Sequence, residues 1–174
     1  MVMNRVLIGL VFLMNYFMKI NDDKFIEIKS RAENFYKLIG QIYCPYFREK
    51  INFNAKGLDH IKMKGWSKAR NKNDQYMRLK LIDLAPEVVR LTHTLQGYAE
   101  GKEFERKKIN SRWENILTIV YYFEFIAVIN GIRVKIIIKQ LPGGEKFFWS
   151  IIPFWRMNQD GTKKILSEGK PSED

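Results

Sequence analysis

Four polar residues, His60, Arg78, Glu124 and Ser150, have side chains that could do acid–base chemistry at a phosphate. Imidazole titrates near neutral pH, so His60 could take a proton from one oxygen and give it to another. The guanidinium of Arg78 could clamp a phosphate bidentately, which a lysine cannot do. Glu124 could complement the histidine as a second acid or base, and the Ser150 hydroxyl could contact a phosphate oxygen. We expect these four residues to be the catalytic ones.

Two of these residues also have a plainer structural interpretation. His60 could cap a helix or bond to a backbone carbonyl, and Arg78 could be a solvated helix charge. Ser150 is not expected to be a hydrolase nucleophile, because the sequence has neither a nucleophile elbow nor an evident base partner. His93, close to Leu91 and Leu95 in an expected helix, is expected to be structural.

The charge balance favours a polyanionic partner. The 174 residues include 30 lysines and arginines against 19 acidic residues, a formal net charge of +11. Such a balance favours nucleic acid, or an anionic membrane surface, as a partner, although many small proteins are basic for solubility alone. Trp149 could stack on bases, or belong to the core. The expected nucleic-acid contacts are Lys62, Lys64, Arg133, Lys135, Lys139 and Trp149.

Metal and cofactor sites are not expected. Only two histidines and one cysteine are present, and no carboxylate-rich ligand set accompanies the histidines. Walker and dinucleotide-binding glycine motifs are absent. The single Cys44 excludes an intramolecular disulfide and fits a reducing compartment, so we expect a cytoplasmic protein, with export or injection as the alternative.

The candidate residues depend on a strong hairpin signal. Asn130-Gly131 separates two β-branched runs, and both positions of a type I′ turn need positive φ. A two-residue turn fixes the register. It predicts one apolar face of four pairs: Phe123–Ile138, Phe125–Ile136, Ala127–Val134 and Ile129–Ile132. The opposite face would pair Tyr122–Lys139, Glu124–Ile137, Ile126–Lys135 and Val128–Arg133, a cationic surface suited to phosphates.

Other segments complete an α+β layout. Helices are expected over residues 21–42 (capped by Asn21 or Asp22), 75–84 (capped by Asp74) and 87–98, with a short strand at 51–54. Residues 100–115 are expected to be a loop or a short strand. A third strong strand, 145–153, follows Pro142-Gly143-Gly144. We therefore expect N-terminal helices packed on a C-terminal antiparallel β-meander of about four strands.

The chain is expected to form one domain, residues 19–157. Residues 1–18 are apolar and have three interpretations: a start codon assigned too early, an export signal, or a tail that touches a membrane. The first is favoured, because no small-residue cleavage site follows. Residues 158–174 are expected to be a polar tail without a fold of its own.

These features resemble the phage-encoded and toxin-associated branch of the barnase–EndoU–colicin–RelE-like nuclease superfamily. The residues that carry the resemblance are Gly57-Leu58-Asp59-His60-Ile61, the helix with Arg78, the hairpin of residues 122–139, and Phe148-Trp149-Ser150-Ile151-Ile152-Pro153. It covers roughly residues 53–156 as a pattern, without a diagnostic string.

The resemblance implies a metal-independent endoribonuclease, with helices followed by a four-stranded antiparallel sheet. His60 would match the early catalytic histidine, Arg78 a phosphate-binding arginine, and Ser150 the hydroxyl of a late strand. The expected reaction is attack of the 2′-hydroxyl of RNA on the adjacent phosphate, in a toxin or phage-associated protein with an antitoxin or immunity protein as a further partner. The alternative is a basic module that binds nucleic acid without cleaving it.

Overall fold

The computed structural model describes residues 20–64, 68–153, 155–157 and 163–165. Its helices are α2 (Asp22–Ile39), α3 (Ala55–Lys62), α4 (Lys72–Leu81), a 3₁₀ turn (Ile82–Leu84) and α5 (Ala85–Leu91). The strands of the main sheet are β1 (Gln41–Cys44), β2 (Glu49–Asn52), β5 (Gly97–Ile109), β6 (Arg112–Ile129), β7 (Ile132–Gln140) and β8 (Lys146–Pro153). Two short pairs complete the structure: β3 (Met63–Lys64) with β4 (Lys68–Ala69), and β9 (Trp155–Met157) with β10 (Lys163–Ile165).

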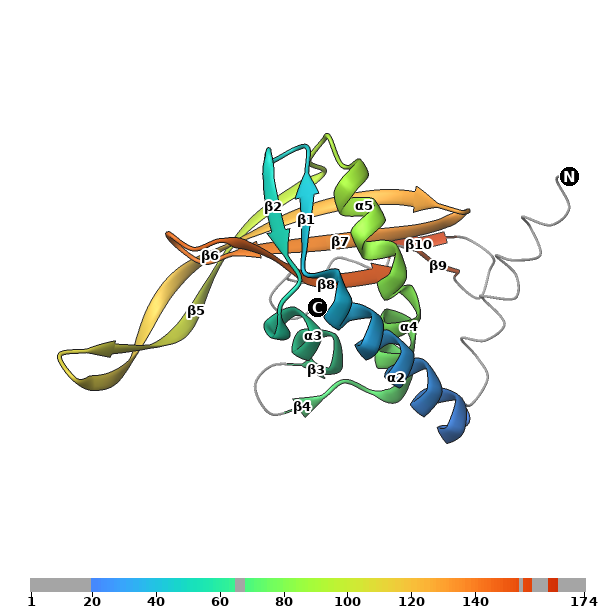
Figure 1. Cartoon of the computed structure of the whole chain (residues 1–174), viewed down its shortest axis with the longest axis horizontal. Coiled ribbons are helices and arrows are strands. Elements are labelled where there is room, and N and C mark those ends of the chain that lie inside the picture. Colours follow the sequence, from blue (N-terminus) through green and yellow to red (C-terminus); the bar gives the residue numbers. More distant parts are fainter. Residues whose placement is uncertain (1–19, 65–67, 154, 158–162, 166–174) are drawn as a thin grey trace, which may run out of the picture.

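The main sheet has six strands in the order β1-β2-β8-β7-β6-β5 (Figure 1). All of its neighbours are antiparallel except β2 and β8, which are parallel and pair only at Asn52 and Phe147. The expected α+β class with an antiparallel meander is confirmed. The expected order of helices first and sheet second is less clear, because β1 and β2 lie between the first two described helices and join the sheet.

The predicted hairpin register is confirmed pair by pair. β6 and β7 meet from Ile129–Ile132 to Tyr122–Lys139 in the expected pairing. Asn130 has φ 50° and Gly131 has φ 78°, as the two-residue turn requires. The turn therefore sorts the side chains of both strands onto two faces of the sheet.

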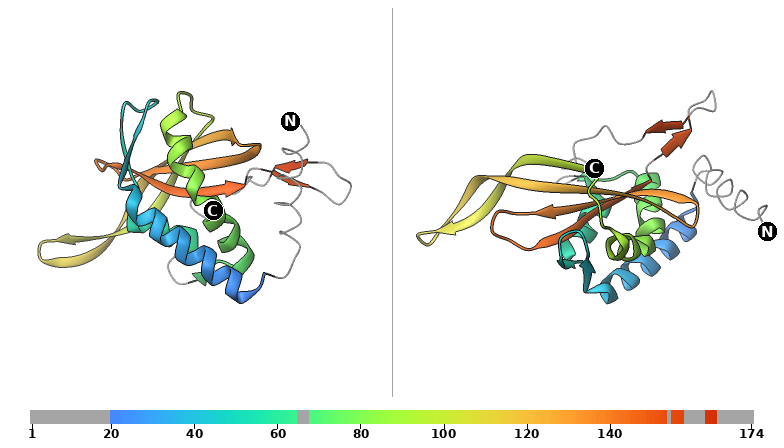
Figure 2. Two further views of the ribbon diagram at one scale, coloured as in Figure 1. Left: turned by 45° about the vertical axis from the view of Figure 1, so that its right-hand side comes forward. Right: turned by 90° about the horizontal axis from the view of Figure 1, so that it is seen from above.

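One face of the sheet carries the main core. Helices α2, α3 and α5 gather on that side in the view from above (Figure 2). Phe125, Ile136, Ile138, Phe148 and Ile151 of the sheet pack there against the apolar sides of the helices. The opposite face holds a smaller apolar cluster of Val120, Tyr122, Ile137 and Ile152. Polar candidates of the hairpin lie on this second face.

Helix boundaries differ from those expected in three places. α2 ends at Ile39, before Gly40, and not at residue 42. α4 begins at Lys72 and not at residue 75, because the side chain of Asn71, rather than that of Asp74, caps it. α5 ends at Leu91, where Thr92 turns extended and its hydroxyl donates to the Val88 carbonyl at 2.7 Å. The expected helix over residues 87–98 is therefore too long. Asn21 caps α2 as expected.

The largest error concerns residues 100–115. They belong to β5 and β6, which pair along the whole of β5 and join through a turn at Asn110 and Ser111, both with positive φ. The chemistry of that turn was not recognised in the sequence. Part of the expected C-terminal tail also forms structure, since β10 pairs with β9. Residues 1–18 and the rest of the tail lie outside the described residues.

Candidate functional site

Gly57 brings α3 against β8. A Cβ at this position would lie 2.2 Å from the carbonyl oxygen of Phe148 and 2.6 Å from the hydroxyl of Tyr36, so only glycine fits without movement. β2 covers only the start of β8. α3 and α4 contact the rest of that strand. His60, one helical turn after Gly57, is thereby placed beside β8.

A β-bulge in β8 places Trp149. The pairing shifts between Ile137 and Ile138, so that Ser150 faces Ile137 while Phe148 faces Ile138. The extra residue of a bulge re-aims a side chain. The Trp149 ring stacks on the His60 ring at 3.9 Å between centroids, and Nζ of Lys139 lies 3.9 Å from the centre of the same indole. Trp149 thus links α3 to the hairpin.

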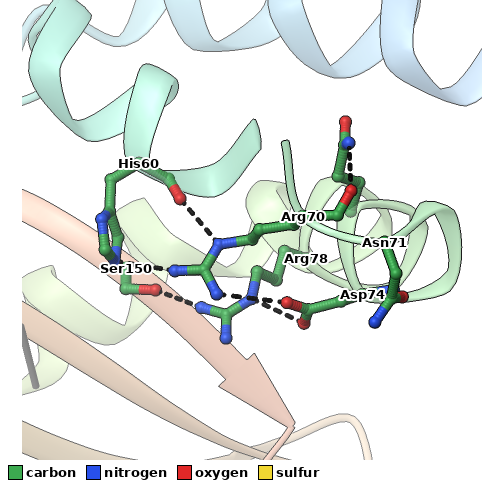
Figure 3. Close-up of polar contacts among 7 residues, drawn as sticks. His60, Arg70, Asn71, Asp74, Arg78 and Ser150 are labelled. Carbon is green, nitrogen blue, oxygen red and sulfur yellow. Dashed lines mark hydrogen bonds and ion pairs between the residues drawn. The ribbon is translucent and has the colours of Figure 1, made fainter. Parts of the chain in front are cut away.

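His60 binds an arginine that the sequence did not single out. Nε of Arg70 donates to the His60 carbonyl, and its Nη2 lies 2.9 Å from Nε2 of the imidazole (Figure 3). A guanidinium can only donate, so Nε2 must be the acceptor and the imidazole proton must sit on Nδ1. His60 is therefore neutral in this arrangement.

The surroundings of His60 reinforce its neutral state. Its side chain is only 6% exposed. Burial is the main cause that lowers the pKa of His60, from 6.5 to about 2, and the charges of Arg70, Arg78 and Lys139 add to it. An imidazole with this pKa stays uncharged throughout the physiological range.

Arg78 lies beside Ser150, as Figure 3 shows. Nη1 of Arg78 donates to Oγ of Ser150 at 2.5 Å, and Nε donates to Asp74 at 2.8 Å. The other oxygen of Asp74 accepts from Arg70 at 3.2 Å, so one carboxylate serves two guanidiniums. Arg78 is 4% exposed and Ser150 is fully buried. Nη2 of Arg78 has no hydrogen-bond partner among the residues that the structure describes.

Lys139 continues the cluster toward β5. Its ammonium donates to both carboxylate oxygens of Glu103, at 2.7 and 2.6 Å, and the phenol of Tyr122 donates to the same carboxylate. Burial lowers the pKa of Lys139, and Glu103 partly opposes this effect. Burial, followed by Glu103, raises the pKa of Tyr122. Lys139 thus keeps a countercharge in the interior.

The remaining hairpin cations are not arranged as an open phosphate-binding face. Lys135 is 3% exposed, as is Lys139, and its ammonium donates to Glu124 at 2.7 Å. Each buried lysine therefore has a carboxylate beside it, because an ammonium in the interior needs one. Glu124 lies in the same row of the sheet as Ser150, with Ile137 between them. Arg133 is exposed beside the turn.

Lys62 and Lys64, also expected to contact nucleic acid, lie outside the hairpin. Lys62, at the end of α3, is close to Glu33 at 3.2 Å and Asp59 at 3.6 Å. Lys64 is exposed in β3. The structure therefore brings together His60, Arg78, Lys139, Trp149 and Ser150, pairs Glu124 with Lys135 on the same sheet face, and leaves Lys62, Lys64 and Arg133 outside this cluster.

Sequence reasoning missed three members of the cluster: Arg70, Asp74 as a ligand of two arginines, and Glu103. A signal for the first two was present, since Arg70 and Arg78 each lie four residues from Asp74, the spacing at which helical side chains meet. Glu103 could not be found, because its strand was not recognised.

Two further observations concern metal sites and membrane-spanning helices. Within the described ranges, no group of three or more His, Cys, Asp or Glu side chains could hold a metal ion. None of the helices in that part of the chain combines the length and the apolar character needed to cross a membrane.

No protein-family model, curated protein or solved structure matches this chain.

Proposed function

We propose that the protein is a metal-independent endoribonuclease in which Arg78 and Ser150 bind the scissile phosphate. Three groups suited to a phosphate support this proposal, because they come from distant parts of the chain and meet at β8: the guanidinium of Arg78, the hydroxyl of Ser150 and, beyond Trp149, the ammonium of Lys139. Toxin or phage-associated activity, with an antitoxin or immunity protein as partner, belongs to the same proposal.

The single observation that carries the proposal is the state of Arg78. A guanidinium has five N–H donors, and two of those of Arg78 are used within the described residues, by Asp74 and Ser150. Asp74 gives it only one oxygen, since the other goes to Arg70. A side chain that is 4% exposed normally has its polar atoms satisfied. Among the described residues, the donors that remain on Nη1 and Nη2 have no partner, and they match two oxygens of a phosphate.

The proposed reaction assigns each proton. The 2′-hydroxyl of the ribose attacks the adjacent phosphorus, its proton passes to Glu124, and the bond to the 5′-oxygen breaks as that oxygen receives a proton from Lys139. Arg78 stabilises the additional negative charge of the transition state. Burial lowers the pKa of Lys139, which makes its ammonium a stronger acid. The products are a cyclic phosphate and a free 5′-hydroxyl.

His60 has a different part in this proposal from the acid–base part expected of it. Because its Nε2 accepts from Arg70 and its pKa is about 2, it is a positioning residue that fixes Arg70 through ring and carbonyl. Arg70 in turn fixes Asp74, which fixes Arg78. The same observation favours the second candidate, a module that binds nucleic acid without cleaving it, since that function needs no titrating histidine.

A cleavage assay separates the two candidates. The full chain is incubated with end-labelled single-stranded RNA in EDTA, together with Arg78→Lys and a matched control, Arg90→Lys, whose side chain is exposed on α5. We expect wild type and R90K to cleave equally, and R78K to cleave about 100-fold more slowly, the usual cost of losing one transition-state donor.

The outcomes are distinct. Circular dichroism and urea midpoints establish that both variants are folded. If wild type shifted the RNA in a gel in a salt-sensitive manner without cleaving it, the protein would be the binding module and not a nuclease. Cleavage by R78K at the wild-type rate would remove Arg78 from the reaction. Growth arrest on expression of wild type but not of R78K is the expected sign of a toxin.

A further inference from the structure

The β5–β6 hairpin extends beyond the rest of the sheet. β6 pairs with β7 only as far as Tyr121, so residues 112–120 of β6 pair with β5 alone. Figure 1 shows this part as a two-stranded arm that projects away from the helices. We call residues 102–109 and 112–119 the arm. Glu103, which accepts from Lys139, joins the arm to the cluster around Arg78.

The pairing register sorts the charges of the arm by face. Lys102 lies opposite Ile119, Phe104 opposite Leu117, and Lys108 opposite Trp113, and alternate residues of a strand share a face. Face one therefore carries three cations and no carboxylate: Lys102, Arg106 and Lys108. Face two carries Glu103, Glu105 and Glu114 together with Lys107 and Arg112. Only face one is uniformly basic.

Face one also exposes large apolar side chains. Phe104 is 65% exposed, Trp113 61%, Leu117 53% and Ile119 45%. The corresponding positions of face two are more covered, with Thr118 buried and Ile116 half-buried. A contiguous apolar patch at the surface usually marks an interaction site. The guanidinium of Arg106 lies 5.3 Å from the Trp113 ring, so cation and aromatic ring already form one surface.

We propose that face one of the arm binds single-stranded nucleic acid. Its cations are complementary to phosphates, and the exposed rings of Phe104 and Trp113 can stack on bases, which only a single strand presents freely. A second copy of the chain is a poorer occupant, because it would bring the same three cations against each other. The arm holds a strand whether or not the chain cleaves it, so this inference is independent of the proposed nuclease.

The test measures binding without cleavage. Fluorescence anisotropy follows a labelled 12-nucleotide single-stranded DNA, which lacks the 2′-hydroxyl nucleophile, over a series of salt concentrations. The triple variant K102Q/R106Q/K108Q removes the charge of face one, and K107Q/R112Q removes cations from face two as the control. We expect at least tenfold weaker binding for the triple variant and a salt slope smaller by about 2, since each single-strand phosphate contact contributes about 0.7. The control should change little.

A second variant tests stacking rather than charge. F104S/W113S should weaken binding about tenfold and leave the salt slope unchanged, because base stacking releases no counterions. R90K, whose side chain is exposed on α5, should bind as wild type does. Because the DNA probe cannot be cleaved, the binding measurements test the arm and the RNA cleavage assay tests the nuclease, so failure of the two proposals gives different results.

Three outcomes overturn the arm proposal. If the face-one and face-two charge variants lost affinity for the single-stranded DNA equally, binding would be a general attraction to a basic protein. If the protein bound duplex DNA more tightly than single-stranded DNA, stacking on bases would not be the basis of recognition. Dimerisation of wild type in size-exclusion chromatography with light scattering, lost in F104S/W113S, would make a second copy the occupant.

Discussion

The buried imidazole of His60 predicts a specific dependence of stability on pH. In the unfolded chain this group has a pKa near 6.5, and in the folded protein burial and the neighbouring Arg70, Arg78 and Lys139 lower it to about 2. Between these two values the unfolded chain holds a proton that the folded protein does not. The neutral imidazole therefore makes its full contribution to the free energy of unfolding above pH 6.5. This contribution is lost as the pH falls toward 2.

The size of the effect follows from the pKa difference. Each pH unit below 6.5 costs about 1.4 kcal/mol of unfolding free energy, so about 3 kcal/mol is lost by pH 4.5. The variant His60→Gln removes this dependence, because its amide oxygen can still accept from Arg70 but does not titrate. We expect H60Q to be less stable than wild type at pH 7.5, and the gap to narrow by about 3 kcal/mol at pH 4.5.

Urea unfolding followed by circular dichroism at pH 7.5, 6.5, 5.5 and 4.5 measures the gap directly. Carboxylates that titrate in this range contribute equally to both proteins and cancel in the difference. His93→Gln is the control, since His93 is exposed. Parallel curves for wild type and H60Q would refute the reasoning, because they would mean that the folded protein leaves the imidazole free to take up its proton.

Three further predictions concern the scaffold of the site. Gly57→Ala should lose about 1–3 kcal/mol of unfolding free energy, because the new Cβ would meet a backbone oxygen at 2.2 Å; Gly144→Ala, whose nearest contact is 3.4 Å, should change little, and equal urea midpoints for the two would contradict this close approach. Ser150→Ala should cost about 1–3 kcal/mol in thermal or urea unfolding, because it removes the acceptor of a buried guanidinium; no loss would mean that this bond does not stabilise the fold. Glu103→Gln should cost about 3 kcal/mol or more, because it leaves a buried ammonium without its countercharge; adding Lys139→Met should restore part of the loss, and failure to do so would argue against an isolated pair.

The hairpin shows where local chemistry was sufficient for prediction. Asn130-Gly131 has few alternatives to a two-residue turn, and such a turn allows one register, so each of the eight predicted pairs of β6 and β7 is present. The apolar face then had to be buried. The cap at Asn21 is equally local, because it needs only a side-chain oxygen two residues before an amide.

The β5 strand shows where local chemistry was insufficient. Residues 100–115 are charged and mixed, and a solvated face of a two-stranded arm has no apolar stripe pointing to the core. Their pairing is maintained by β6, whose inner half is anchored in the sheet. The same pairing ends the helix that was expected to reach residue 98, because Gly97 and Tyr98 already belong to β5.

The sequence by itself determined the α+β class, the register of the central hairpin and the residue types available for phosphate chemistry, because turns and two-residue periodicity act between near neighbours. Only the tertiary structure decided that His60, Arg78 and Ser150 meet, across 72 positions between the last two. It also decided that the imidazole is neutral and that the hairpin lysines are buried beside carboxylates. Burial and countercharge depend on which distant segments pack together, here α3 and α4 against the edge of β8 that β2 leaves uncovered.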